Sequence, residues 1–315
     1  MGETVAILMA TYNGEKYIAE QIESILNQTY KDWFLFISDD GSKDATLDII
    51  QTYLDNYNDR IRLIGKNGHK GAKNNFNYLL QQVQEYAYYM FADQDDIWVD
   101  EKIEIQMREM LNLEKKNGKE KPLLVFSDMK VVDESLGIIS DSFFEYSNLN
   151  WKEENLLIKY LIHNYTAGCC MLCNHNMIEC AGNIPECAAM HDYWIALVAA
   201  GIGTIKYIDL PLNLYRQHGG NAIGARQGKW KISNLKNSFS NDNIEKLRKE
   251  KKEKNDMACE LLLRYYTRIS PDMKRMIQDF SVCNKKRSII KILLLNKRYK
   301  LKLSVNYIFL LMLKI

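Results

Sequence analysis

The chain has 315 residues, of which 47% are hydrophobic and 26% are charged, and only 4 are prolines. This composition excludes collagen-like, mucin-like and globally disordered proteins, and the length fits about two domains or one large α/β domain with an appendage. Residues 1–228 hold 20 basic and 32 acidic residues, whereas residues 229–315 hold 22 basic and 8 acidic ones. The second segment is strongly basic and points to an anionic surface, either a membrane or a nucleic acid.

Apolar runs of strand length alternate with segments of helical periodicity from the N-terminus onward. Strands are expected at 4–10, 33–38, 61–64, 88–92 and 123–127, and helices at 15–28, 44–57, 72–85 and 102–114. This alternation predicts an α/β fold with a mainly parallel sheet and helices on both faces, whose ligands bind at the carboxyl ends of the strands. Polar turns follow three of these strands, at 11–14, 39–42 and 93–96.

The remaining chain continues the pattern and then becomes basic. Further elements are expected as a helix at 151–161, a strand at 167–172, a helix at 191–200, a strand at 204–208 and a polar loop at 215–228. A Lys-rich helical region extends from about residue 241 to the end, and its longest apolar run has seven residues, far below the roughly 20 that span a bilayer. We therefore predict an α/β domain at 1–228 and a basic helical region at 229–315.

The seven cysteines and the absence of an N-terminal apolar segment predict a reducing, cytoplasmic location without a disulfide framework. Cys170 and Cys173 form a CxxC pair, but no second Cys or His pair follows at zinc-finger spacing. Because Met171 and Leu172 flank these thiols, we expect them to be buried in an apolar strand.

Three carboxylates, those of Asp93, Asp95 and Asp96, directly follow the apolar segment 88–92. Their mutual repulsion costs energy unless a positive charge compensates it. A hard divalent cation with oxygen ligands, Mg²⁺ or Mn²⁺, meets this requirement and leaves positions open for substrate phosphates. The alternative is a solvated acidic turn ahead of a helix, whose N-terminus attracts carboxylates without any metal.

Asp39 and Asp40 end the second predicted strand, and Ser42 or Asp44 is expected to cap the helix that follows. One of the two aspartates is thus expected to be structural. A carboxylate at this edge can accept the N3 hydrogen of uracil or thymine, or the N1 and N2 hydrogens of guanine, whereas cytosine and adenine offer no matching ring donor. A turn with a helix cap and no nucleotide explains the same residues.

No GxxxxGK[ST] loop and no GxGxxG loop is present, which argues against P-loop NTPases and nicotinamide enzymes. Any bound phosphates must then be held by a metal and by cations. His191 and Asp192 begin a predicted helix, and Arg216 and His218 lie in the polar loop 215–228. Taken alone, Asp192 is more typical of an N-cap than of a general base, and Arg216 and His218 are more typical of surface residues.

Six segments, taken together and in this order, resemble the inverting family 2 glycosyltransferases of the GT-A fold, most of all the bacterial branch that contains polysaccharide rhamnosyltransferases. The resemblance covers residues 3–226, over two thirds of the chain. The matching segments are ATYNGEKYIAEQIESILNQTY at 10–30, ISDDGSKDAT at 37–46, FADQDDIW at 91–98, TAGCCML at 166–172, HDYW at 191–194 and YRQHGGNAIGA at 215–225.

The resemblance implies transfer of a sugar from a nucleoside diphosphate to an acceptor hydroxyl, with Asp192 as the general base. It implies a bound Mg²⁺ or Mn²⁺ at Asp95, Asp93 and His218, with Asp95 as the direct ligand. Nucleotide-sugar contacts are implied for Ala10, Thr11, Tyr12, Asn13, Glu15, Asp40, Lys73, Asp93 and Arg216. Acceptor contacts are expected from Trp98, His191 and Tyr193. This branch often has two tryptophans in the motif at 191–194, whereas HDYW has Tyr193 in place of one of them.

The resulting hypothesis is a metal-dependent inverting glycosyltransferase that builds a bacterial capsular or cell-surface polysaccharide on a lipid-linked or oligosaccharide acceptor. The expected donor is dTDP-rhamnose, with UDP-galactose and UDP-glucose as alternatives. A sugar-phosphate nucleotidyltransferase also uses aspartates at strand ends, but it needs a glycine-rich, basic N-terminal loop. The segment ATYNGEKY has few glycines and few basic residues. A non-enzymatic nucleic-acid-binding module would leave the six segments unexplained, so no nucleic acid partner is expected.

The basic C-terminal region lies outside the resemblance. Nine Lys and Arg residues between 280 and 315 would attract an anionic leaflet, where each contributes about 1 kcal/mol. We therefore expect a cytoplasmic enzyme that is peripheral at the inner face of the cell membrane, where a lipid-linked acceptor lies. A solvated helical face and a homo-oligomer contact are the alternatives for the same residues.

Overall fold

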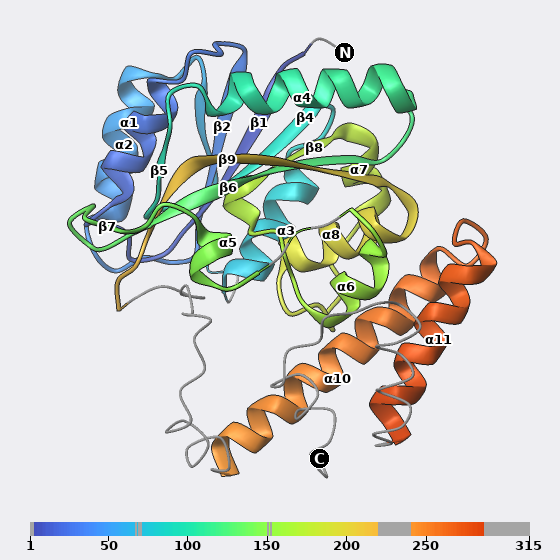
Figure 1. The fold of residues 1–315 in the computed structure, drawn as a ribbon. Helices are drawn as coiled ribbons and strands as arrows, with labels where there is room; N and C mark the ends of the chain where they lie inside the picture. The colour runs from blue at the N-terminus through green and yellow to red at the C-terminus, as the bar shows by residue number, and fades with distance from the viewer. Residues whose placement is uncertain are drawn as a thin grey trace.

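The computed structural model of the chain describes residues 3–219 and 241–286, except residues 67, 69, 70, 150 and 152. A sheet with the strand order β3-β2-β1-β4-β8-β6-β9-β5 forms the centre, and β7 pairs with β6 (Figure 1). The strands are β1 Val5–Thr11, β2 Trp33–Asp39, β3 Ile61–Gly65, β4 Tyr88–Asp93, β5 Ile97–Trp98, β6 Leu123–Val132, β7 Ile138–Ser140, β8 Met171–Asn174 and β9 Thr204–Arg216.

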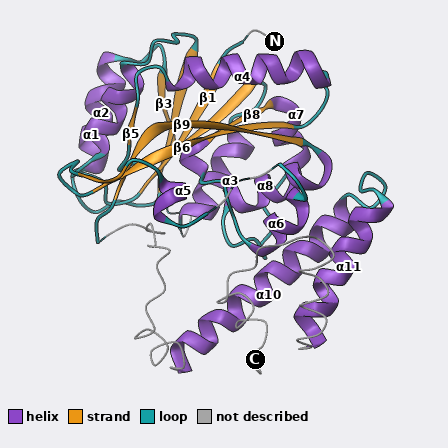
Figure 2. Cartoon of the chain, viewed as in Figure 1, coloured by secondary structure: helices purple, strands orange, loops and turns teal. Residues whose placement is uncertain are grey.

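Helices cover both faces of the sheet, as predicted (Figure 2). The described helices are α1 Ile18–Leu26, α2 Thr46–Asn56, α3 Ala72–Gln82, α4 Lys102–Asn117, α5 Phe143–Tyr146, α6 Leu156–Ile162, α7 His175–Ala181, α8 His191–Ile202, α10 Asn241–Arg264 and α11 Pro271–Lys286, with a 3-10 turn η1 Gly168–Cys170. Helices α1, α2 and α4 pack on one face, and α3, α6 and α8 pack on the other.

Strand β1 shows why the central strands are apolar throughout. Val5, Ile7 and Met9 point into the cluster with α1, α2 and α4, whereas Ala6 and Leu8 point into the cluster with α3, α6 and α8. Successive strand residues face opposite sides of a sheet, so a strand covered on both sides needs apolar residues at every position. The run TVAILMA meets this requirement.

The sheet is mixed but mainly parallel. Strands β3, β2, β1 and β4 are parallel neighbours, and β6 is parallel to β9. Strand β8 runs antiparallel to both β4 and β6 and thereby joins the two parallel parts. The predicted fold class is confirmed, but the antiparallel orientation of β8 was not predicted, because an apolar run carries no information on strand direction.

Several predicted elements differ from the observed ones. The strands expected at 123–127 and 204–208 extend to Val132 and Arg216, so the loop expected at 215–228 begins within β9. The segment 167–172 begins with η1, and its strand β8 starts only at Met171. The helix expected at 151–161 starts at Leu156, and the ring of Trp151 instead packs edge-on against Phe126, with 4.9 Å between centroids. The short elements β5, β7, α5 and α7 were not predicted. The thiols of Cys170 and Cys173 are buried, as expected.

The basic C-terminal region is helical where it is described, and it packs on α6 and α8 (Figure 1). Leu261, Tyr265 and Phe280 are buried in the same hydrophobic cluster as those two helices. Helices α10 and α11 therefore extend the core of the α/β unit. The predicted boundary at residue 228, and residues 287–315 with most of the basic side chains expected at a membrane, lie outside the described residues. Within the described ranges, no helix has the length and apolarity of a membrane span.

Candidate active site

The three polar turns predicted at strand ends lie side by side. Thr11 at the end of β1 stands opposite Asp39 of β2, and Ala10 stands opposite Asp93 of β4. Since neighbouring strands are about 4.8 Å apart, the turns 11–14, 39–42 and 93–96 share one edge of the sheet. The predicted grouping at the carboxyl ends of the strands is confirmed.

The two aspartates that end β2 have different environments. Asp39 is fully buried and accepts hydrogen bonds from Thr11 Oγ1 at 2.9 Å and from the amides of Gly41 and Ser42 at 2.9 and 2.8 Å. Asp40 is partly exposed, and its Oδ2 accepts a hydrogen bond at 2.5 Å from the amide of Gly71, which precedes α3. Asp39 is thus the structural aspartate, and the carboxylate of Asp40 lies at the rim.

The loop after β1 is fastened to the loop after β2. The amide of Asn13 donates to Ser42 Oγ at 2.8 Å, and Glu15 Oε2 accepts from the amide of Ala45 at 2.8 Å. The N-cap position of α2 is Ala45, but the predicted capping by Asp44 is present: its Oδ1 accepts from the amide of Thr46, the first residue of α2, at 3.1 Å. Asp44 Oδ2 accepts from the Glu15 amide at 3.1 Å. Asn13 Oδ1 also accepts from the Lys43 amide at 2.9 Å, so the side chains of Asn13 and Glu15 hold this loop in place.

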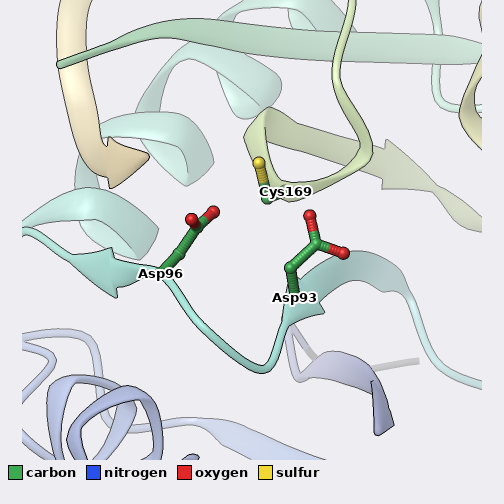
Figure 3. Close-up of side chains that lie close together, drawn as sticks. All are labelled: Asp93, Asp96 and Cys169. Carbon is green, nitrogen blue, oxygen red and sulfur yellow. The ribbon is translucent and has the colours of Figure 1, made fainter. Parts of the chain in front are cut away.

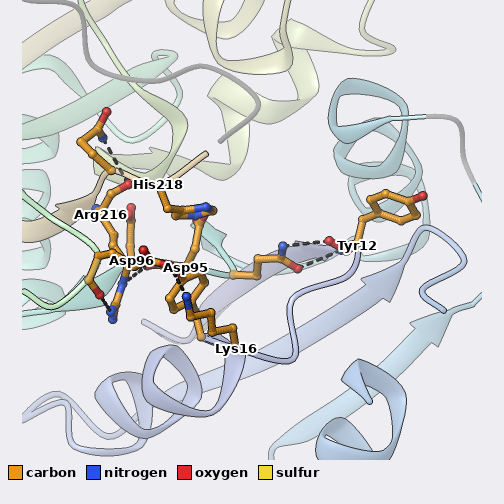
Figure 4. Close-up of polar contacts among 10 residues, drawn as sticks. Tyr12, Lys16, Asp95, Asp96, Arg216 and His218 are labelled. Atoms are coloured by element: carbon orange, nitrogen blue, oxygen red, sulfur yellow. Dashed lines mark hydrogen bonds and ion pairs between the residues drawn. The ribbon is translucent and has the colours of Figure 1, made fainter. Parts of the chain in front are cut away.

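Tyr12 projects from the same loop and is 54% exposed. Gln94 clamps its backbone, because Gln94 Nε2 donates to the Tyr12 carbonyl at 2.9 Å and Oε1 accepts from the Tyr12 amide at 2.8 Å (Figure 4). The neighbouring Thr11 side chain is buried, and Ala10 is partly buried. Among the residues predicted in this loop, Tyr12 is the one that presents a large side chain to solvent.

Asp93 ends β4 and lies beside Cys169 of η1, the turn that precedes the antiparallel neighbour β8. Ligand atoms of Asp93, Asp96 and Cys169 all lie within 4.8 Å of one another (Figure 3). Burial and the charges of Asp95 and Asp192 raise the pKa of Asp93 to about 7. Burial and the neighbouring carboxylates also raise the pKa of Asp96 well above its usual range.

This group of carboxylates fits a hard divalent cation. Asp96 is fully buried, and within the described part of the chain its Oδ2 has no hydrogen-bond partner. A buried carboxylate oxygen without a partner is costly unless a cation compensates it. Carboxylate oxygens are the ligands that Mg²⁺ and Mn²⁺ prefer. The predicted ligands were Asp93, Asp95 and His218, and the sequence did not single out Cys169.

Arg216 ends β9, His218 follows two residues later, and both contact the same turn (Figure 4). His218 Nε2 lies 2.7 Å from Asp95 Oδ2. Arg216 is 2% exposed, its amide donates to Asp96 Oδ1 at 3.2 Å, and its Nε donates to the Asp95 carbonyl at 2.9 Å. The structure therefore brings both residues to the acidic turn on which the resemblance placed the metal.

The guanidinium of Arg216 is bound within the protein. Its Nη1 donates to the Glu134 carbonyl at 2.8 Å, and its Nη2 pairs with Glu20. Its Cζ lies 4.7 Å from the centroid of the Tyr17 ring. The Tyr17 hydroxyl donates to Glu134 Oε1 at 2.5 Å, and its ring centroid lies 4.7 Å from that of His218. Arg216 thus joins α1 and the β6–β7 turn to the 93–96 turn, and its predicted diphosphate contact would require these bonds to change.

Lys73 on α3 is directed toward the segment that precedes α8. Its Nζ donates to the carbonyls of Glu186 at 2.8 Å and Ala188 at 3.0 Å. The ammonium therefore holds α3 against this segment. A nucleotide contact from Lys73 would require it to leave these carbonyls.

Asp192 lies in the first turn of α8, next to η1. Its Oδ2 accepts from the Gly168 amide at 3.0 Å, and its Oδ1 accepts from the Tyr193 amide at 2.5 Å. Burial raises the pKa of Asp192 to about 6, although these amides act in the opposite direction. The charge of Asp192 in turn raises the pKa of Asp93, so the two carboxylates lie within electrostatic reach of each other. Sequence reasoning did not find Gly168.

The three residues expected at the acceptor are buried. Trp98, His191 and Tyr193 are 1%, 2% and 6% exposed. The ring of His191 stacks on Phe76 with 4.0 Å between centroids, and burial lowers its pKa to about 3, which keeps it neutral. Neither Trp98 nor His191 offers a face to an acceptor in this arrangement, so their predicted contacts do not fit. Large aromatic rings supply much of a core, and a motif alone does not separate this use from sugar stacking.

Comparisons with known proteins identify the family of the chain. Residues 6–178 match the family model Glycosyl transferase family 2. The dTDP-rhamnosyl transferase RfbG of Shigella flexneri is 32% identical over 231 residues, which are 69% of this chain and 74% of that protein. The UDP-Glc:alpha-D-GlcNAc-diphosphoundecaprenol beta-1,3-glucosyltransferase WfgD of Escherichia coli is 37% identical over 107 residues, which are 34% of this chain and 41% of that protein.

Two similar solved structures support the fold. TarS residues 1–349 of S. aureus, in complex with UDP-GlcNAc, align with a TM-score of 0.54 and 17% identity over 94% of this chain and 88% of that chain. The mannosyltransferase PcManGT of Pyrobaculum calidifontis, in complex with GDP-Man and Mn²⁺, aligns with a TM-score of 0.52 and 12% identity over 98% of this chain and 83% of that chain. With its GT-A-like α/β fold and the family match over more than half its length, the chain belongs to glycosyl transferase family 2 and is a glycosyltransferase.

Proposed function

We propose that the protein is a metal-dependent inverting glycosyltransferase that moves a sugar from a nucleoside diphosphate to an acceptor hydroxyl in cell-surface polysaccharide biosynthesis. The observation that carries this proposal is the partly buried Asp192, held by two amides within electrostatic reach of Asp93. Membership of family 2 removes the nucleotidyltransferase and nucleic-acid-binding alternatives.

Asp192 has the chemistry of the general base. Its pKa of about 6 leaves it ionised at neutral pH, and its carboxylate takes up a proton more readily than that of an ordinary aspartate. Proton removal from the attacking hydroxyl by such a base contributes typically about 10²- to 10⁴-fold. Attack from the side opposite the departing diphosphate inverts the anomeric carbon.

Asp93, Asp95 and Asp96 would hold the divalent cation, with His218 beside Asp95. When bound, Mg²⁺ or Mn²⁺ would neutralise charge on the departing diphosphate. The protein's own contribution is a carboxylate cluster that is positioned before the reaction, since Arg216 fixes the 93–96 turn through the Asp95 carbonyl. Such preorganisation is usually the largest contribution to catalysis.

The donor is proposed to be dTDP-rhamnose, with UDP-glucose and UDP-galactose as alternatives. The partly exposed Asp40 can accept the N3 hydrogen of thymine or uracil, and the exposed ring of Tyr12 can stack on the base. The name of RfbG, a dTDP-rhamnosyl transferase with 32% identity, favours the first donor. The glucosyltransferase WfgD and the complex of TarS with UDP-GlcNAc favour a UDP-sugar.

The acceptor is proposed to be lipid-linked, since the name of WfgD specifies a diphosphoundecaprenol acceptor. A lipid-linked acceptor would require the enzyme to work at the inner face of the cell membrane, as a cytoplasmic, peripheral protein. The basic residues between 280 and 315 supply the charge for such an attachment. A contact between copies of the chain through the same region is the alternative.

The test is release of nucleoside diphosphate from dTDP-rhamnose, UDP-glucose and UDP-galactose, each with a diphosphoundecaprenol-linked sugar, with and without Mn²⁺. We expect turnover with one donor only, loss of turnover on chelation, and an inverted anomeric configuration in the product. Asp192→Asn should bind this donor but lose at least about 10²-fold in turnover. Retention of configuration, or full turnover by Asp192→Asn, would contradict the proposal.

A further inference from the structure

The turn η1 connects the two parts of the proposed site. The Gly168 amide donates to Asp192 Oδ2 at 3.0 Å. One residue later, the thiol of Cys169 belongs to the group formed with Asp93 and Asp96 (Figure 3). The position of η1 therefore sets where the proposed base lies relative to the acidic group.

Three buried polar side chains hold the carbonyls of η1. Lys102 Nζ donates to the Cys169 carbonyl at 2.5 Å, and Asn213 Nδ2 donates to the same carbonyl at 3.0 Å. Gln106 Nε2 donates to the Cys170 carbonyl at 2.7 Å. Lys102 also donates to Asn213 Oδ1, and the three side chains are fully buried. They come from α4 and β9, so η1 is fixed from two elements at once.

Burial of the Lys102 ammonium has an energetic cost. A fully buried lysine is rare unless it is paired, and none of the ion pairs between described residues includes Lys102. Its ammonium donates to two neutral oxygens and lies 4.4 Å from the centroid of the Trp98 ring, and it acts on the carboxylates of Asp93 and Asp96 through longer-range electrostatic attraction. Lys102 is also the first residue of α4, where the helix dipole disfavours a positive charge. Packing alone would be served better by an apolar side chain.

We propose that Lys102, supported by Asn213 and Gln106, is a positioning residue for the transfer reaction, acting through η1 on Asp192. This inference rests on the proposed function of Asp192 as base. The ammonium fixes the Cys169 carbonyl, the turn then directs the Gly168 amide at Asp192, and the carboxylate is held against the acidic group. Lys102 itself touches neither donor nor acceptor.

Two variants and one control test this role in the full-length protein. Lys102→Met removes the ammonium and keeps much of the side-chain volume. Gln106→Met removes one support at little risk to folding, because Gln106 Oε1 has no hydrogen-bond partner in the described ranges. Lys116→Met, at an exposed position on the same helix, is the matched control. We expect kcat to fall about 10- to 100-fold in Lys102→Met and about 3- to 10-fold in Gln106→Met, with a small change in donor KM.

A second readout separates positioning from loss of folded protein. A hydrogen bond to a carboxylate stabilises its charged form, so a displaced Gly168 amide should raise the pKa of Asp192. We expect the carbon NMR signal of the Asp192 carboxylate, assigned from its absence in Asp192→Asn, to titrate at higher pH in both variants than in the wild type. Partial unfolding would lower kcat without moving this midpoint.

Other ionisable groups near Asp192 do not obscure the measurement. Asp93 on β4 and Tyr160 on α6 interact with its charge, and His191 precedes it on α8. Burial keeps His191 and Tyr160 neutral between pH 5 and pH 8, by lowering the pKa of the histidine to about 3 and raising that of the tyrosine. Asp93 does titrate near this range, and the residue-specific signal distinguishes it from Asp192.

The outcomes of the two proposals are distinguishable. An unchanged Asp192 midpoint in Lys102→Met and Gln106→Met overturns the positioning role, whatever their turnover. A shifted midpoint in a protein whose wild type transfers no sugar from any nucleotide donor would leave the positioning role intact and overturn the proposed function. A shifted midpoint together with a lowered kcat supports both.

Discussion

Asp192 shows at the residue scale how a proposed catalytic group opposes stability. Its folded-state pKa of about 6 exceeds the roughly 3.9 of an unfolded aspartate, so the native protein binds this proton more tightly than the unfolded chain does. The stability contributed by the group is therefore fully present below about pH 4 and is lost as the pH rises through about 6.

This linkage gives a prediction for Asp192→Asn. Between pH 4 and pH 7, we expect the free energy of unfolding of the variant to rise relative to the wild type by about 2 kcal/mol. Urea unfolding at both pH values measures the difference, and Asp59→Asn at an exposed position is the control. A difference between Asp192→Asn and the wild type that stays constant over this range would show that folding does not raise the pKa of Asp192.

Gly168 is a second residue whose identity is constrained by the site. A Cβ at this position would lie 2.8 Å from His191 Nε2, and the stacked, buried histidine ring has little room to move. We expect Gly168→Ala to cost about 1–3 kcal/mol of stability and to lower kcat at least tenfold. Gly219→Ala, whose Cβ would meet nothing within 4 Å, is the control for stability. Wild-type turnover in Gly168→Ala would mean that η1 tolerates displacement.

At this scale the sequence predicted the acidic residues better than their surroundings. Asp93 was found because a motif and a strand end both marked it, whereas Asp192, at the start of a predicted helix, was found from the resemblance. Trp98 and His191 were predicted to contact the acceptor, but they are buried. The sequence does not distinguish an aromatic residue that packs in the core from one that binds a sugar. Lys102 was missed because a lysine in an amphipathic helix is expected on the solvent side.

At the scale of elements, Arg216 links four separate parts of the chain. Its guanidinium contacts Glu20 on α1, the Glu134 carbonyl after β6 and the Asp95 carbonyl after β4, while its backbone ends β9. Such contacts between distant segments leave no periodic or local signal in the sequence. This explains why Arg216 was predicted only from the resemblance, and why Tyr17 and Glu134 were not predicted.

Arg216→Lys tests whether this link holds the acidic turn. A lysine cannot reproduce the planar fork of donors, so buried partners lose hydrogen bonds that contribute about 1.5–3 kcal/mol each when charged. We expect a loss of about 2–3 kcal/mol in unfolding free energy and at least tenfold weaker Mn²⁺-dependent donor binding, measured by urea unfolding and calorimetry. Arg108→Lys, exposed on α4, is the control. Unchanged donor affinity in Arg216→Lys would show that Arg216 does not support donor binding.

For the whole molecule, the charge count and the structure give different information about the C-terminal region. The excess of basic residues suggested a surface-binding appendage, whereas the structure buries Leu261 and Phe280 in the cluster that also contains α6 and α8. A charge count averages over a helix and cannot detect one apolar face. The helix that carries Asp192 is therefore supported on its outer side by a segment beyond the family match.

This arrangement predicts that α10 and the catalytic unit unfold together. Leu261 is fully buried, and its Cδ2 lies 3.3 Å from the position that a Cβ on Gly201 of α8 would take. We expect Leu261→Ala to cost about 2–4 kcal/mol in one cooperative transition, followed both by circular dichroism and by loss of nucleotide-sugar binding. Leu263→Ala, at a 77% exposed position two residues away, should change stability by less than about 0.5 kcal/mol. If α10 unfolded independently, Leu261→Ala and the wild type would lose nucleotide-sugar binding at the same midpoint.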